Sequence, residues 1–252
     1  MNIFCTDLDN TIIYSYKHNI GNDKINVEIY EDREISYITK KTYDLLNIVK
    51  KEYMIIPTTT RTIEQYKRID LGIGDFKYAL VCNGGVLLIN GEIDKKWYEN
   101  SLELIKDSKD ELEKGILILE KDSRRKIETK FIEKLFVFTK CREPKDVTKF
   151  LKSQLNTKLV DILSNGEKIY IIPKNLSKGA AIRRLKEKLC PKNLIVAGDS
   201  EFDISMLEEA NYGFLANEFN LTNKIANKII KIEAEKLYSE ALLEKIIIND
   251  IY

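Results

Sequence analysis

The stretch Asn2-Ile3-Phe4-Cys5-Thr6-Asp7-Leu8-Asp9-Asn10-Thr11 decides the fold of this chain. Its apolar beginning predicts a β-strand over residues 2–6, which delivers two carboxylates, Asp7 and Asp9, at its carboxyl end. In open α/β sheets ligands bind at that edge, and two acids so close can act as nucleophile and proton carrier while they share a cation. Taken alone, the pair is interpreted equally well as a solvated turn after an edge strand.

A second group of acids follows the apolar run at residues 194–197. Ser200 can cap a helix predicted over residues 201–208, which turns Asp203 back toward Asp199. Several carboxylates would then converge, and they would repel one another unless a hard cation neutralised them. Oxygen ligands without His or Cys favour Mg²⁺ over zinc. The alternative for Asp203 is ordinary stabilisation of a helix N-terminus.

Groups that suit a phosphate lie between these acids. A strand predicted over residues 53–57 is followed by Thr58-Thr59-Thr60-Arg61-Thr62, where hydroxyls and free N–H groups at the start of a helix (residues 62–70) form an anion site. A plain helix cap would explain one threonine and not four. Lys178 opens another predicted helix, where the helix dipole disfavours a cation. A nearby carboxylate or phosphate would account for this lysine, which by itself resembles a surface lysine.

Four motifs stand in order along the chain: Asp-x-Asp-x-Thr, Thr-Thr-Arg, Ser-Lys-Gly and Gly-Asp-Ser-x-x-Asp. Together they resemble the haloacid dehalogenase superfamily of phosphatases and phosphotransferases, over nearly the whole chain. The resemblance implies that Asp7 is the nucleophile that attacks phosphorus and that Asp9 is the general acid and then the base. It further implies that Thr59 and Lys178 are catalytic groups that hold the phosphoryl group.

The same resemblance implies a Mg²⁺ cofactor. Asp7, Asp199 and the backbone carbonyl of Asp9 would be direct ligands. Asp203 would act through a water molecule or by contact with the ligands instead of with the metal. Further candidates for contact with the phosphate or its leaving group are Thr60, Arg61 and Asn83. The dehalogenase branch, which attacks carbon, typically lacks the second acid of the first motif, so Asp9 favours phosphate-ester chemistry.

The rhythm of strands and helices predicts an α/β fold, with a Rossmann-like parallel sheet as its core and an inserted α+β cap domain. The core is expected at residues 1–96 and 174–252, and the cap at residues 97–173. Core strands are predicted over residues 2–6, 53–57 and 78–82, with a hairpin around the turn signals Asn83-Gly84 and Asn90-Gly91. In the cap we expect helices over 101–114 and 145–155 and strands over 127–131, 135–140, 159–164 and 168–172.

This arrangement is similar to the large-cap branch of the superfamily, which includes Cof-like, sucrose-phosphatase-like and mannosyl-3-phosphoglycerate phosphatase-like proteins. The segment around Tyr212 resembles the strand of that branch that ends on an asparagine, here Asn217. One departure is the long segment 14–37, which predicts a β-hairpin from residues 27–30 and 34–37. It either covers the site or forms a solvent-exposed flap.

Composition agrees with an enzyme. The 252 residues carry 41 basic and 40 acidic side chains, a formal charge of +1, so we expect no nucleic-acid or membrane partner. No segment approaches the roughly 20 apolar residues of a membrane span, and we expect a cytoplasmic protein. The four cysteines form no Cys-x-x-Cys pair, and His18 is the only histidine, which argues against zinc.

The sequence therefore predicts a Mg²⁺-dependent phosphatase that hydrolyses a small phosphorylated metabolite, a sugar phosphate or phosphoglycosyl compound, through an aspartyl-phosphate. Two alternatives stay open. A phosphosugar mutase of the same branch would use the same motifs and return the phosphoryl group to sugar. A non-enzymatic protein that binds a phosphorylated ligand would be expected to lose a catalytic position, and none is lost. The oligomeric state and the physiological substrate are not predicted.

Overall fold

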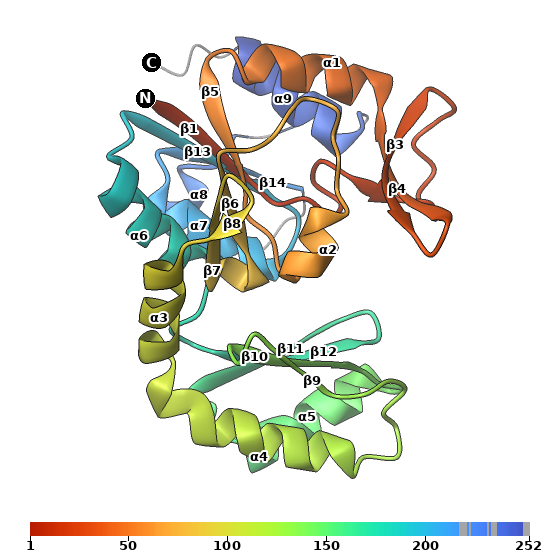
Figure 1. Ribbon diagram of the computed structural model, residues 1–252, viewed down its shortest axis with the longest axis vertical. Helices are drawn as coiled ribbons and strands as arrows, with labels where there is room; N and C mark the ends of the chain where they lie inside the picture. Colours follow the sequence, from red (N-terminus) through yellow and green to blue (C-terminus); the bar gives the residue numbers. More distant parts are fainter. Residues whose placement is uncertain (217–220, 222, 231, 233–235, 249–252) are drawn as a thin grey trace. The chain divides into compact units, whose positions relative to one another are not determined.

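The computed structural model describes residues 1–216, 221, 223–230, 232 and 236–248. The chain divides into two compact units (Figure 1). Unit 1 combines Met1–Ile93 with Lys178–Tyr252, and unit 2 is Asp94–Ser177. The residue Asn217 of the sequence analysis lies outside the described residues. The role of unit 2 as a substrate-selecting cap stays a prediction.

A four-stranded parallel sheet forms the centre of unit 1, in the order β14-β13-β1-β5. The strands are β1 (Asn2–Thr6), β5 (Tyr53–Pro57), β13 (Asn193–Gly198) and β14 (Tyr212–Leu215). Because both faces of β1 and β13 are covered, their sequences are nearly continuous apolar runs. All strands run in one direction, so their carboxyl ends meet at the same edge of the sheet.

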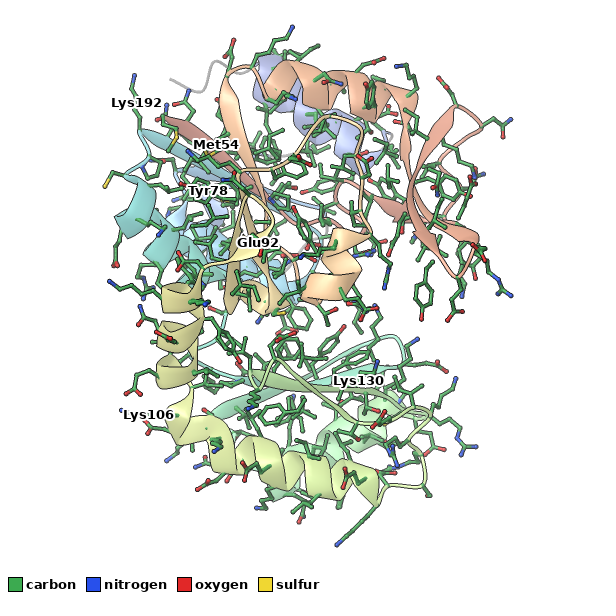
Figure 2. The ribbon with its side chains drawn as sticks, in the orientation of Figure 1. Met54, Tyr78, Glu92, Lys106, Lys130 and Lys192 are labelled. Carbon is green, nitrogen blue, oxygen red and sulfur yellow. The ribbon has the colours of Figure 1, made fainter. Side chains whose placement is uncertain are left out.

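Helices cover this sheet (Figure 1). They are α1 (Lys40–Val49), α2 (Ile63–Lys67), α6 (Lys178–Leu189), α7 (Ile204–Glu209), α8 (Asn223–Ala226) and α9 (Tyr238–Ile248). One buried cluster joins Leu46 of α1 and Leu242 of α9 to Phe4 of β1. Figure 2 draws the side chains on the ribbon. None of the helices in the described part of the chain is long and apolar enough to cross a membrane.

The hairpin predicted after the first motif is present in the structure. It consists of β3 (Lys24–Tyr30) and β4 (Arg33–Thr39), and the short β2 (Tyr14–Ser15) pairs with β4. Glu31 and Asp32 form its two-residue loop, with φ of 50° and 58°. Positive φ at both positions gives the turn whose twist matches that of the flanking strands.

The third predicted core strand differs from the expectation. Among the described residues, strand β6 (Tyr78–Val81) joins the parallel sheet only through a bridge between Thr58 and Leu80. Instead it pairs antiparallel with β7 (Val86–Ile89), which pairs with β8 (Glu92–Ile93). The N–H of Thr59 donates to the Leu80 carbonyl. Because N–H groups alternate between the two sides of a strand, the nitrogen of Pro57 also faces β6, and as a proline nitrogen it has no proton to donate.

Unit 2 is an antiparallel sheet in the order β11-β12-β10-β9 with helices of its own. Its elements are α3 (Lys95–Leu104), α4 (Lys109–Glu120), β9 (Lys130–Ile132), β10 (Phe136–Lys140), α5 (Pro144–Gln154), β11 (Val160–Asn165) and β12 (Lys168–Pro173).

The helix predicted over residues 101–114 is wrong. A short 3₁₀ turn, Lys106–Ser108, separates α3 from α4 at this place. Asp94 caps α3 through the N–H of Trp97, so that helix begins six residues before the predicted start, at Lys95. The buried Ser108 donates its hydroxyl to the Leu159 carbonyl, which ties the turn to the segment before β11.

Candidate active site

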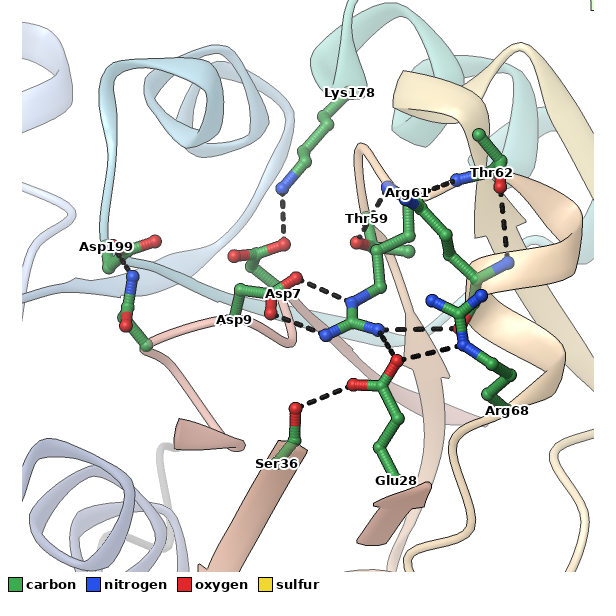
Figure 3. A network of polar contacts seen from close by, with 12 residues as sticks. Asp7, Asp9, Glu28, Ser36, Thr59, Arg61, Thr62, Arg68, Lys178 and Asp199 are labelled. Carbon is green, nitrogen blue, oxygen red and sulfur yellow. Dashed lines mark hydrogen bonds and ion pairs between the residues drawn. The ribbon is translucent and has the colours of Figure 1, made fainter. Parts of the chain in front are cut away.

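Strands β1 and β13 deliver acids to the same edge of the sheet. Asp7 follows β1, and its N–H donates to the carbonyl of Ala197 at 2.8 Å. Asp199 follows β13, and its carboxylate accepts from the side-chain amide of Asn10 at 3.3 Å (Figure 3). The register that pairs Thr6 with Ala197 therefore sets the two predicted acidic loops side by side.

Asp203 lies at the end of a 3₁₀ turn, Glu201–Asp203, that Ser200 caps. One carboxylate oxygen of Asp203 accepts from the N–H groups of Asp199 and Ser200 at 3.1 and 3.0 Å, and from the Ser200 hydroxyl at 2.9 Å. A Cβ at Gly198 would lie 2.2 Å from the Cβ of Asp203. Glycine is required there because the Asp203 side chain folds back against the strand end.

Lys178 is the first residue of α6, and its side chain is 1% exposed. Its ammonium donates to Asp7 Oδ1 at 2.7 Å and to Asp203 Oδ1. These two carboxylates explain why a cation stands at a helix N-terminus. Burial lowers the pKa of Lys178, but the charges of Asp203 and Asp7 raise it more, so the group stays protonated. A Cβ at Gly179 would lie 2.2 Å from the Ser205 carbonyl oxygen, so glycine also permits α6 to approach α7 closely.

Carboxylate oxygens of Asp7, Asp199 and Asp203 lie within 4.8 Å of one another. Burial raises the pKa of Asp7 well above its ordinary value, although Lys178 opposes the shift. Burial and the charge of Asp203 raise the pKa of Asp199 to about 6. Three carboxylates face one ammonium, a formal charge of −2, and all the donors are hard oxygens. This donor set fits Mg²⁺.

The threonine loop after β5 lies beside the first acidic loop. The N–H of Thr58 donates to the Thr6 carbonyl at 2.8 Å, which sets Thr59 level with Asp7. Thr59 is fully buried, and its hydroxyl accepts from the N–H of Arg61 at 3.1 Å. That hydroxyl retains its proton for donation.

The structure also brings Asn83 to the threonine loop. The Asn83 N–H donates to the Thr59 carbonyl at 3.0 Å, and the residue is buried with a φ of 58°. Asparagine tolerates this left-handed conformation better than most residues. Thr60 is partly buried in the same loop. The roles of these residues toward a phosphate stay predictions.

Arg61 and Asp9 form a two-pronged ion pair. Arg61 Nε and Nη2 donate to the two oxygens of Asp9, each at 2.7 Å (Figure 3). The sequence suggested that Arg61 contacts the phosphate or its leaving group, whereas in the structure its guanidinium is bound to an acid of the first motif. The carboxylate of Asp9 is thus directed to Arg61, and its predicted metal ligand is the backbone carbonyl.

Sequence reasoning missed Glu28. Its carboxylate accepts from Arg61 Nη1 at 2.8 Å, Arg68 Nε at 3.2 Å and the Ser36 hydroxyl at 2.6 Å. Burial raises its pKa, but these hydrogen bonds and the Arg61 charge lower it more, so the net shift is downward. No sequence signal marked this residue, because residues 25–29 alternate between apolar and polar side chains, and that pattern places Glu28 on the polar side of the strand.

Comparison with known proteins adds independent findings. The sequence profile of the haloacid dehalogenase-like hydrolases matches residues 86–236, more than half of the chain, including Lys178, Asp199 and Asp203. Among curated protein sequences, none matches.

Several solved structures share the fold of this chain. A sucrose-phosphatase from Synechocystis, in complex with sucrose and phosphate, has a TM-score of 0.65 at 17% identity, over 98% of this chain and 96% of that one. The C-terminal domain of a trehalose-6-phosphate phosphatase from C. albicans has a TM-score of 0.55 at 17% identity, over 96% of this chain and 91% of that one.

A third similar structure, from Bacteroides thetaiotaomicron, is described among phosphatases of the haloalkanoate enzyme superfamily. It has a TM-score of 0.56 at 13% identity and covers 99% of this chain and 96% of that one. At these identities the likeness is one of fold, and it extends over both units. The expectation of an α/β hydrolase with an inserted unit is confirmed: the chain belongs to the haloacid dehalogenase-like hydrolase family.

Proposed function

We propose that this protein is a Mg²⁺-dependent phosphatase that hydrolyses a small phosphorylated metabolite through an aspartyl-phosphate on Asp7. The observation that carries the proposal is the buried ammonium of Lys178, which is shared between Asp7 and Asp203 beside Asp199. This arrangement keeps one carboxylate at the end of β1 in place and leaves negative charge for a divalent cation. Bound Mg²⁺ would neutralise the acids and the phosphoryl oxygens.

In the first step, an oxygen of Asp7 attacks phosphorus, and the bond from phosphorus to the ester oxygen breaks. Asp9 gives a proton to the departing alkoxide. In the second step, Asp9 takes a proton from water, the water oxygen attacks phosphorus, and the Asp7 carboxylate is released with inorganic phosphate. Lys178 and the Thr59 hydroxyl hold the phosphoryl oxygens, which carry most of the charge in the transition state.

We infer a sugar phosphate or a phosphoglycosyl compound as the substrate. Support comes from the fold, which is shared with a sucrose-phosphatase and a trehalose-6-phosphate phosphatase. Unit 2 would select the leaving group, since it is inserted in the chain between the threonine loop and Lys178, the first residue of α6.

The test is release of inorganic phosphate from sugar phosphates, phosphoglycerates and nucleotides, with Mg²⁺ and with EDTA. We expect Asp7→Asn to abolish release, because an amide oxygen is a poor nucleophile toward phosphorus. Asp44→Asn, on the exposed face of α1, is the matched control and should keep full activity. Phosphate release that persists in Asp7→Asn would contradict the mechanism. No release by the wild type from any compound would contradict the phosphatase and favour a mutase or a binding protein.

A further inference from the structure

The β3–β4 hairpin has no part in the chemistry described so far, yet it contributes a buried charge. The side chain of Glu28 is 1% exposed. An acid is rarely buried to this extent unless it is paired. The partners of Glu28 come from three places in unit 1: Ser36 on β4, Arg61 in the threonine loop and Arg68 after α2.

A β-bulge turns Glu28 inward. The register of β3 against β4 shifts between Asn26 and Glu28, and the neighbours Val27 and Glu28 are both buried. In a regular strand these two side chains would point to opposite faces. The side-chain amide of Asn26 donates to the carbonyls of Glu28 and Ser36, at 3.1 Å each, which holds the bulge in shape. Bulges of this kind re-aim a side chain.

The hairpin is fixed to the segment behind the threonine loop. The N–H of Asp70 donates to the Val27 carbonyl at 2.9 Å, and Glu28 forms a bridge with Ile69. The position of Glu28 is therefore set by backbone contacts as well as by its own ion pairs. A side chain placed in this way can orient a partner, because it does not move with that partner.

That partner is the guanidinium of Arg61, which is held on two edges. One edge donates to both oxygens of Asp9, and the remaining nitrogen, Nη1, donates to Glu28 (Figure 3). The planar fork of an arginine held at both edges cannot rotate away from either acid. Two arginines and two acids make the group formally neutral.

Exposure distinguishes the members of this network. The side chain of Asp9 is 48% exposed, that of Arg61 is 12% exposed and that of Glu28 is 1% exposed. The chain of contacts thus begins at a fixed, buried acid and ends at an accessible one. Buried ion pairs are weak stabilisers of folds, and apolar residues of similar volume often serve as well. A role at the accessible end accounts for the network better than stability does.

We propose that Glu28 is a positioning residue, which holds Arg61 and through it keeps the carboxylate of Asp9 in place for proton transfer to the leaving group. The inference rests on the proposed phosphatase function. It gives a role to Glu28 of the β3–β4 hairpin. Loss of Glu28 should then impair only the proton transfer by Asp9.

The test compares two esters with different leaving groups. An alkyl phosphate needs a proton on its departing oxygen, whereas p-nitrophenolate departs without one. We expect Glu28→Gln to lower kcat/KM about 10- to 100-fold on the alkyl phosphate that the wild type hydrolyses fastest, because general acid catalysis contributes roughly 10²- to 10⁴-fold. On p-nitrophenyl phosphate the same variant should lose less than about threefold, since it leaves Asp7 and Lys178 in place.

Two further variants separate positioning from folding. Glu34→Gln changes an exposed acid on the same hairpin and should match the wild type on both esters. Combining Glu28→Gln with Arg61→Ala tests the route of the effect. If Glu28 acts through Arg61, the double variant should have a kcat/KM on the alkyl phosphate less than about twofold below that of Arg61→Ala alone.

Equal losses on the two esters would overturn the inference, as would an unchanged alkyl phosphatase activity or a full further loss in the double variant. A wild type that hydrolyses neither ester would instead refute the proposed function, and the inference with it. Each variant is assayed well below its measured thermal unfolding midpoint, so that an equal loss on both esters counts against the inference.

Discussion

Lys178 is a charged residue in a place where a charge must be compensated. Its ammonium is buried between two carboxylates at the start of a helix, where the dipole is unfavourable to it. Asp7 and Asp203 outweigh that effect because they lie within hydrogen-bond distance in a poorly solvated site. The lysine therefore stabilises the same acids that the proposed reaction uses.

Replacing Lys178 should reveal this coupling. We expect Lys178→Met to lower the free energy of unfolding by about 3–5 kcal/mol without Mg²⁺, because two buried acids lose their counter-charge. Phosphate release should fall below detection. Lys186→Met, on the same helix with a side chain 41% exposed, should cost less than about 1 kcal/mol. Urea unfolding of the three proteins measures these differences, and equal stability of the two variants would contradict the expectation.

Glu28 should make the stability of the protein depend on pH. Its pKa in the folded state lies below the ordinary 4.5, so folding favours the ionised form. The stabilisation is complete above pH 4.5 and is lost as the pH falls through the lowered pKa, because the unfolded chain takes up its proton first. The difference in unfolding free energy between wild type and Glu28→Gln, about 1–3 kcal/mol at neutral pH, should shrink toward pH 3. A difference that does not change with pH would contradict this.

Lys178 and Glu28 differ in how well the sequence alone could identify them as site residues. Lys178 could be recognised from sequence because a cation in the first turn of a helix conflicts with a local rule. Glu28 could not, because the alternation of a regular strand places it on the side opposite Val27, and only the bulge brings both inside. Arg61 was recognised as functional, but the acids to which it is bound lie 52 and 33 residues away in the chain.

At the scale of elements, buried parallel strands were predicted best. The expected strands 2–6 and 53–57 match β1 and β5, and the predicted helix that Lys178 opens matches α6. In these elements the apolar residues, and the residues that mark the ends of the strands and the helix, favour the same structure that the tertiary contacts require. The single helix predicted over 101–114 failed, since the break at Lys106–Ser108 depends on a contact with Leu159 far along the chain.

The loop after β13 depends on the absence of a side chain at Gly198. We expect Gly198→Ala to displace Asp203, because the new Cβ would lie 2.2 Å from the Asp203 Cβ. The rise in melting temperature on addition of Mg²⁺ should then shrink or vanish. Gly166→Ala is the control: it has a φ of +54° in the β11–β12 turn with no atom nearby, so it carries backbone strain alone. An unchanged Mg²⁺ response in Gly198→Ala would contradict the role of the loop.

At the scale of the whole molecule, unit 2 has its own sheet and core and is continuous in sequence, whereas unit 1 is assembled from two separated segments. We expect residues 94–177 expressed alone to unfold cooperatively in urea. Residues 1–93 alone should show no such transition, because β1 then lacks its neighbour β13. Leu151→Asp in the first fragment, which places a charge at a fully buried position, should abolish its transition. A non-cooperative 94–177 fragment would contradict the independence of this unit.

The pairing of Asn2 with Asn193 also has a consequence for synthesis on the ribosome. Strand β1 can meet β5 early, but its other edge has no partner until β13 emerges, roughly 100 residues after Ile93. At about 5–20 residues per second, this interval lasts roughly 5–20 s. During that time the nascent chain carries an open apolar strand edge while unit 2 is being synthesised. The insertion of unit 2 thus makes unit 1 the part of the nascent chain that most needs a chaperone.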